Sequence, residues 1–179
     1  MSKRQEPTSQ SEGLWVRSEL LPDGSYGIGL SLDADKAWAF NEADAVLYAH
    51  SLLREVAFSL YDAAVVAQVQ RKMNLGPKEA AQMVCDLREL RGPSAWPGDL
   101  SYVGGVNMRG RAFLTACWKG EPEFQLDPGP AREHAVAVLE VVTTSGLDNT
   151  YKKVLMEKVG IEDWRASNVV DDLLHWRRR

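Results

Sequence analysis

The pattern of hydrophobic and polar positions first predicts three short strands. Residues 25–32 alternate apolar and small side chains, the period-2 pattern of a half-buried strand. Residues 14–20 and 37–40 have strand composition, and a turn signal that ends at Gly24 separates the first two segments. The chain is therefore expected to open with a three-stranded meander.

Helical periodicity follows the strands. Apolar residues recur at spacings of three and four, which predicts an amphipathic helix capped by Asn41. Asp62 has the character of a second N-cap, so we expect a separate helix over residues 63–74. A third helix is expected over residues 78–91, because Pro77 is tolerated at a helix start.

The same series of elements recurs later in the chain. A shift of 86 residues, without a gap, lays residues 14–91 over residues 100–177. Residues retained in both copies include Leu14/Leu100, Gly24/Gly110, Ala45/Ala131, Ala49/Ala135, Leu53/Leu139, Val56/Val142, Ser59/Ser145, Asp62/Asp148, Lys72/Lys158, Ala80/Ala166, Val84/Val170, Leu87/Leu173 and Arg91/Arg177. The second set of elements is expected at 100–107, 111–118 and 123–126, then in a helix ending at Gly146 and in helices at 149–160 and 164–177.

This repetition defines the predicted organisation. We expect an α+β protein, a tandem duplication of a β-β-β-α-α-α unit packed as a pseudo-twofold pair. Residues 14–91 form repeat unit 1 and residues 100–177 form repeat unit 2. A linker rich in glycine and proline, 92–99, joins them, and residues 1–13 form a disordered polar arm.

The repeat also predicts core residues and two ion pairs. The expected buried residues are Leu53, Val56, Leu87 and their copies Leu139, Val142 and Leu173. If the last two helices of each unit run antiparallel, their far ends meet. Asp62 is then expected beside Arg91, and Asp148 beside Arg177.

Composition and charge narrow the class of protein. The 179 residues are 45% hydrophobic and carry a net charge of −4. No apolar run approaches the ~20 residues of a membrane span, and the N-terminus lacks the apolar stretch of a secretory signal, so a cytoplasmic protein is expected. The two repeat units carry −3 and −2, and only the tail Arg177–Arg179 is strongly cationic. This balance disfavours a nucleic-acid partner.

Motifs for catalysis or metal binding do not stand out. His50, His134 and His175 are not duplicated, and no two share a helix at ligand spacing. The chain contains no Gly-x-Ser-x-Gly motif and no phosphate-cradling loop, and Cys85 and Cys117 are isolated. We therefore expect no enzymatic activity, no cofactor and no metal site.

Binding to another protein remains the favoured function. Candidate partner contacts are Trp15, Trp96, Trp164, Arg177, Arg178 and Arg179, since tryptophan and arginine dominate binding hot spots. The alternative for Trp96 is that its side chain fills the junction between the two units.

A nucleic-acid-associated regulator is the alternative function, using the helix-turn-helix hairpins at 62–91 and 148–177 and the basic tail. Its last helices would begin with Glu79 and Asp163, which would face phosphate and repel it, and we expect no basic cluster around either site.

The helical segments also carry a resemblance. Four short segments are similar in sequence to uncharacterised proteins of actinobacteria and their phages: residues 49–56 (AHSLLREV), 60–63 (LYDA), 79–81 (EAA) and 86–88 (DLR). The resemblance is confined to the helical stretches and implies no activity.

Overall fold

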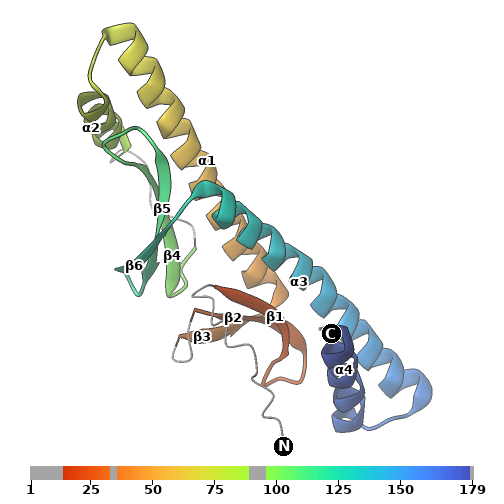
Figure 1. Cartoon of the computed structure of the whole chain (residues 1–179). Coiled ribbons are helices and arrows are strands. Elements are labelled where there is room, and N and C mark those ends of the chain that lie inside the picture. The colour runs from red at the N-terminus through yellow and green to blue at the C-terminus, as the bar shows by residue number, and fades with distance from the viewer. Residues whose placement is uncertain (1–13, 33–35, 89–95, 178–179) are drawn as a thin grey trace, which may run out of the picture.

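The computed structural model describes residues 14–32, 36–88 and 96–177 and has an α+β fold (Figure 1). The first set of elements is β1 (Trp15–Leu20), β2 (Tyr26–Ser31), β3 (Ala37–Phe40), α1 (Glu42–Met73) and α2 (Pro77–Arg88). The second set is β4 (Leu100–Val106), β5 (Ala112–Trp118), β6 (Glu121–Leu126), α3 (Pro128–Val154), a π-helical turn η1 (Leu155–Val159) and α4 (Asp163–Arg177). Elements of the two sets alternate in space along one elongated body.

The two predicted meanders are confirmed. Each set contains a three-stranded antiparallel sheet in sequence order, β1-β2-β3 and β4-β5-β6. Both first hairpins turn at a glycine with positive φ, Gly24 at 81° and Gly110 at 75°. Residues with side chains would be strained there, which explains why glycine is present at both turns.

The helices differ from the prediction, because each set has two rather than three. α1 runs unbroken through Asp62, and α3 runs unbroken through Gly146 and Asp148. Neither aspartate is an N-cap; both are buried inside a helix. The buried face of each helix continues past its aspartate, to Val66 on α1 and to Lys152 on α3, so tertiary packing overrides the local signals. The two long helical segments end in left-handed caps, α1 at Asn74 and the π-helical turn after α3 at Gly160.

Each sheet is covered by the long helix of the other set. α1 packs on β4 and β5, whereas α3 packs on β1 and β2. A Cβ added to Gly110 would lie 3.0 Å from Val66 of α1, and one added to Gly24 would lie 3.4 Å from Lys152 of α3. A three-stranded sheet has one apolar face that water must not reach, and here a helix from the other half covers it.

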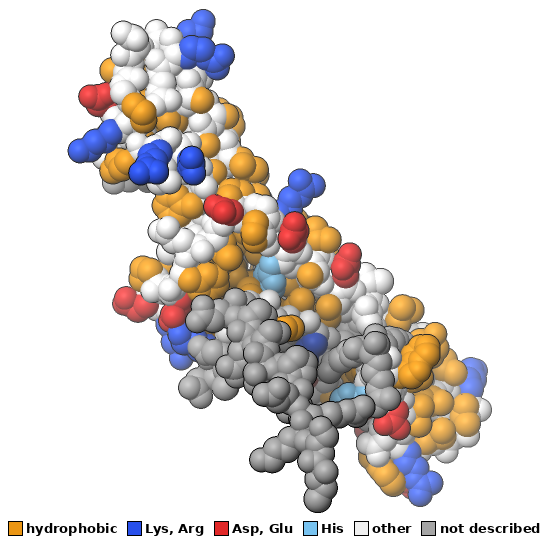
Figure 2. All heavy atoms as spheres, viewed as in Figure 1, with side chains coloured by type: hydrophobic (Ala, Val, Ile, Leu, Met, Phe, Trp, Pro, Cys, Tyr) orange, Lys and Arg blue, Asp and Glu red, His pale blue; other side chains and the backbone are white. Residues whose placement is uncertain are grey.

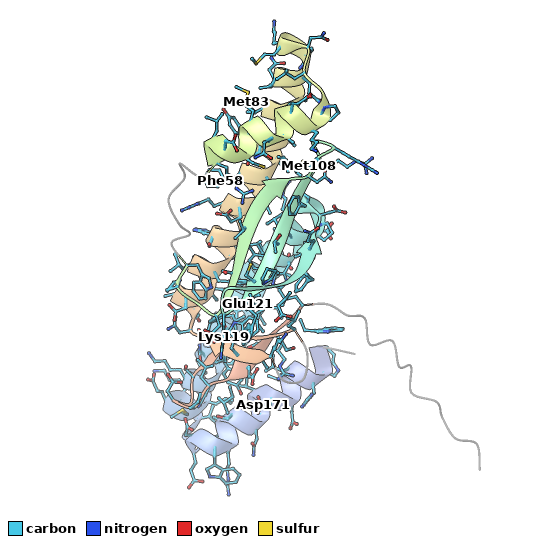
Figure 3. The ribbon with its side chains drawn as sticks, turned by 90° about the vertical axis from the view of Figure 1, so that its left-hand side faces the viewer. Phe58, Met83, Met108, Lys119, Glu121 and Asp171 are labelled. Carbon is cyan, nitrogen blue, oxygen red and sulfur yellow. The ribbon has the colours of Figure 1, made fainter. Side chains whose placement is uncertain are left out.

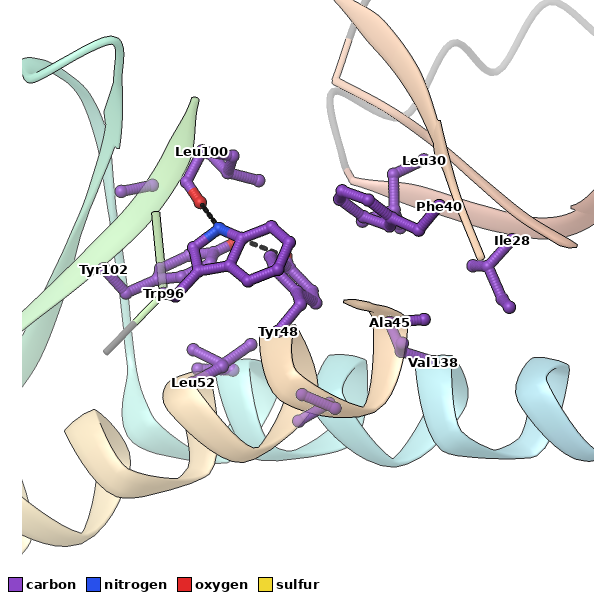
Figure 4. Packing of buried hydrophobic residues seen from close by; sticks show 14 of the residues in the cluster. Ile28, Leu30, Phe40, Ala45, Tyr48, Leu52, Trp96, Leu100, Tyr102 and Val138 are labelled. Carbon is purple, nitrogen blue, oxygen red and sulfur yellow. Dashed lines mark hydrogen bonds between the residues drawn. The ribbon is translucent and has the colours of Figure 1, made fainter. Parts of the chain in front are cut away.

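The long helices also pack against each other at the centre of the molecule. Small residues at four-residue spacing lie on both helices and are fully buried: Ala45 and Ala49 on α1, and Ala131 and Ala135 on α3. They leave room for large side chains to fill the space above the helices. Figure 4 shows this core, where Trp96 lies between Tyr48 and Leu100 and its Nε1 donates to the Leu100 carbonyl oxygen at 2.7 Å.

The predicted core residues separate into two groups. Val56 is buried, and Leu53, Leu139 and Val142 are partly buried against the core. Leu87 and Leu173 are 55% and 40% exposed, so their predicted burial is wrong.

The outward position of these two leucines follows from how their helices pack. α2 turns Ala80 and Val84 inward, and α4 turns the equivalent Ala166 and Val170 inward. The predicted partners of the buried aspartates, Arg91 and the Arg177 side chain, lie outside the described residues.

Helix capping differs between the two sets. The Asn41 side chain accepts from the backbone N–H of Asp44 at 2.8 Å, which confirms the predicted cap. Asp127 occupies the same place before α3 but makes no capping hydrogen bond through its side chain. Pro128 at the start of α3 leaves one fewer backbone N–H to satisfy. Within the described residues, no helix has the length and apolar character to cross a membrane.

Replacing Leu52 by alanine tests the packing of α1. Leu52 is fully buried, so Leu52→Ala is expected to lower the free energy of unfolding by about 2–5 kcal/mol. Leu87→Ala is the matched control, a leucine on the outer face of α2, and is expected to change it by less than about 0.5 kcal/mol. Urea titration followed by circular dichroism measures both, and equal losses would contradict the observed packing.

Candidate functional site

A cluster of aromatic residues lies where the two sets meet. The hydroxyls of Tyr48 and Tyr102 are 2.8 Å apart, and the Tyr48 hydroxyl is 3.1 Å from His134 Nε2. The Tyr48 ring also meets the Trp96 ring edge-on, with centroids 5.7 Å apart. Tyr48 and His134 stand 86 residues apart in sequence, so these two equivalent positions touch each other.

The protonation states of this cluster favour a structural role. Burial raises the pKa of Tyr48 and of Tyr102 well above the usual tyrosine value, so both hydroxyls stay neutral. Burial lowers the pKa of His134 to about 4, so its ring is neutral at pH 7. A neutral histidine and two neutral phenols form a hydrogen-bonded tie between α1, α3 and β4.

A second polar network joins β1 and the β1–β2 turn to α3. The Ser18 hydroxyl donates to the buried carboxylate of Asp148 at 3.0 Å. Lys152, whose side chain is also buried, donates to the carbonyl oxygen of Gly24 and forms a salt bridge to Asp163 at 2.8 Å. A buried ammonium needs such partners, because an isolated buried charge is strongly unfavourable.

Tyr26 extends this network to α4. Its hydroxyl donates to Asp171 Oδ1 at 2.9 Å, and the Ser167 carbonyl oxygen lies 3.0 Å from the same hydroxyl. Burial, and then the bond to Asp171, raises the pKa of Tyr26, which keeps the hydroxyl a donor. The Asn149 side chain bonds to the backbone N–H and carbonyl of Tyr26 at 2.6 and 2.8 Å. The network thus fixes α4 and the first sheet to α3.

The positions that the 86-residue shift relates to this network are mostly apolar at the other end of the molecule, although Asp62, which corresponds to Asp148, is buried there. There Val66, Ala112 and Cys85 occupy the positions of Lys152, Tyr26 and Asp171. Val66 packs with Ala80, Val84 and other apolar residues of α1, α2 and β4. The two ends of the molecule are therefore held together by different chemistry.

The described residues offer few groups for catalysis. No group of three or more His, Cys, Asp or Glu side chains among them could hold a metal ion. Burial, with a smaller contribution from Glu121, raises the pKa of the Cys117 thiol, which disfavours a reactive thiolate. A depression of about 160 Å³ on the outer face of the first sheet contains an Arg17–Glu19 salt bridge at 3.3 Å, which is an ordinary exposed pair.

The candidate partner contacts fall in different environments. Trp15 is 58% exposed and Trp164 is 57% exposed, so both are accessible to a partner. Trp96 is only 8% exposed and belongs to the core, which leaves it no role as a surface contact and fits the alternative that its side chain fills the junction. The Arg177 side chain, Arg178 and Arg179 lie outside the described residues.

The structure adds surface residues that sequence reasoning missed. Met83 and Leu87 project outward from α2, and Val169, Leu173 and Trp176 project outward from α4. The only available signal was that residues 83 and 87, and 169 and 173, stand four apart on one helix face. The same spacing is also typical of the buried face of a helix, and the sequence therefore predicts Leu87 and Leu173 in the core.

Comparison of the chain with protein-family models, with curated proteins and with solved structures gives no match.

The pKa of His134 gives a testable pH dependence. Its folded pKa of about 4 lies below the ordinary value of 6.5, so the unfolded chain takes up a proton first as the pH falls. This residue alone is expected to lower the free energy of unfolding by about 2–3 kcal/mol between pH 7 and pH 4. His134→Gln does not titrate in this range. Subtracting its urea-unfolding pH profile from that of the wild type isolates the effect, and a flat difference would contradict a partly buried, neutral histidine.

Proposed function

We propose that this chain is a non-enzymatic binding protein that acts through protein–protein contacts. The observation that carries the proposal is the outward-facing apolar row on α2 and α4. Each of these helices packs against the core through its opposite face, α2 with Ala80 and Val84, and α4 with Ala166 and Val170. The outer residues are therefore not needed by the fold, and apolar side chains gathered on a surface mark interaction sites.

The two rows occupy equivalent positions. Met83 and Val169 stand 86 residues apart, and so do Leu87 and Leu173. Trp176 extends the row on α4 and is 75% exposed, and tryptophan is the residue most enriched at binding hot spots. Two similar rows suit a partner that presents the same surface twice.

We also propose that the chain is a tandem duplication whose halves pack about a pseudo-twofold axis, with a β-β-β-α-α unit in place of the six-element unit expected from sequence. Three pairs of equivalent features support this proposal. The contact of Gly24 with Lys152 corresponds to that of Gly110 with Val66. The caps Asn74 and Gly160 stand 86 residues apart, as do the buried Asp62 and Asp148.

A cytoplasmic location is part of the proposal. Cys85 and Cys117 are both free thiols, which suits a reducing compartment.

Site-specific photo-crosslinking in the native host tests the binding function. A photoreactive amino acid at position 83 or 169 is expected to give a discrete adduct with one and the same protein. The control position is Ala67, which is exposed on α1 and belongs to neither row. Leu87→Glu and Leu173→Glu are expected to remove the adduct while circular dichroism stays unchanged, because a charge in an apolar interface is strongly unfavourable. Equal labelling from position 67, or adducts that survive both substitutions, would contradict the proposal.

A further inference from the structure

The two equivalent ends of the molecule carry opposite charge. We define the basic end as residues 63–88 with residues 105–112, which belong to α1, α2 and the β4–β5 hairpin. Its cations are Arg71, Lys72, Lys78, Arg88, Arg109 and Arg111. They stand against two carboxylates, Glu79 and Asp86, which leaves a net charge of +4. The equivalent residues at the other end, 149–174 with 19–26, contain four cations and seven carboxylates, a net charge of −3.

Packing brings the cations of the basic end onto one part of the surface. Val66, Val84 and Val106 form a single apolar cluster, so α1, α2 and β4 are held together there. The β4–β5 turn lies against α1, and the Arg88 guanidinium lies over Gly105 of β4. Figure 2 shows the Lys and Arg side chains gathered at this end with few acidic ones among them, and Figure 3 places Met83 and Met108 at the same end, far from Asp171.

The carboxylates of the described residues do not neutralise these cations. None of the six forms a salt bridge with another described residue. At the opposite end, three of the four cations are paired with carboxylates: Lys152, Lys153 and Arg165. The helix dipole accounts for cations near the end of α1, such as Lys72. It does not account for Arg109 and Arg111, which lie in a β-hairpin.

This arrangement corrects, at one of the two helical hairpins, the expectation that no basic cluster surrounds either site: cations gather around the hairpin of α1 and α2 but not around that of α3 and α4. Local sequence around α2 does not contain Arg109 and Arg111, whose hairpin comes to this end because α1 covers the second sheet. The carboxylate expected to repel phosphate, Glu79, accepts from the backbone N–H of Gly76 at 2.7 Å, and Asp86 accepts from Gln82 at 2.8 Å. Both acids are thus bound to neighbours on their own helix or loop.

We propose that the basic end binds the phosphate backbone of double-stranded nucleic acid without reading its sequence. Four of the six cations are arginines, whose planar guanidinium groups match phosphate oxygens. The cations are spread over several elements on an open surface, as a linear array of phosphates requires. Among the described residues, no tryptophan lies at this end to stack on unpaired bases, which favours a duplex over a single strand.

Fluorescence anisotropy with the full-length chain and a labelled DNA duplex of about two helical turns tests this site. If four or five cations contact phosphates, log K is expected to fall against log salt with a slope of about −4 to −5. Affinity is then expected to drop about 10²- to 10³-fold between 50 and 200 mM KCl. Arg109→Ala combined with Arg111→Ala is expected to reduce the slope by about two. No binding at 50 mM, or an unchanged slope, would overturn the proposal.

The proposed duplication supplies a matched control. Lys72 and Lys158 are the same residue at equivalent positions, both exposed, but they lie at opposite ends of the molecule. Lys72→Ala is expected to reduce the slope by about one, and Lys158→Ala is expected to leave it unchanged. Both are surface substitutions with little effect on folding, so the comparison decides the matter even where the double arginine variant fails to fold.

Two further outcomes would assign the binding elsewhere and overturn the proposal. Poly-L-glutamate that binds as tightly as the duplex would indicate an acidic protein surface as the partner. Loss of binding in Arg178→Ala combined with Arg179→Ala, with no effect of Lys72→Ala, would assign the contact to the C-terminal tail. Leu173→Glu, at the opposite end of the molecule, tests the protein-binding row separately.

Discussion

The structure depends on covering two small sheets, each with a single apolar face. Three strands cannot bury that face alone, and in this chain the long helix of the opposite set covers it. α1 therefore touches the second sheet and α3 touches the first, and the two helices cross through small residues such as Ala49 and Ala135. Neither half can bury its own sheet without the other, so the fold is one interlocked core.

The same exchange of helices explains why the two ends differ so much. An end is built from one half's helices and the other half's hairpin, so its surface combines residues that are far apart in sequence. At one end, the elements pack around an apolar cluster that includes Val66, and the cations lie on the surface. At the other end, the elements are joined by the polar network of Asp148, Lys152 and Tyr26. We assign the proposed binding functions to the surfaces of these two ends.

Local signals in the sequence predicted the strands, both glycine turns and the Asn41 cap, because each depends on neighbouring residues only. They failed at Asp62 and Asp148, where a cap-like residue lies on a buried helix face. They failed again at Leu87 and Leu173, because a four-residue spacing does not tell which face turns inward. The basic end was missed for a third reason: Arg109 and Arg111 join it through the exchange of helices, which is a non-local feature.

Site-resolved amide hydrogen exchange tests the interlocked core most directly. Val138 is a fully buried residue of α3, which covers the first sheet. Val138→Ala is expected to lower the free energy of unfolding by about 1–3 kcal/mol. If the core is one cooperative unit, amides of β2 and of β5 lose the same protection free energy. A loss confined to β2, with β5 unchanged, would show that the two sheets unfold separately and would contradict the account.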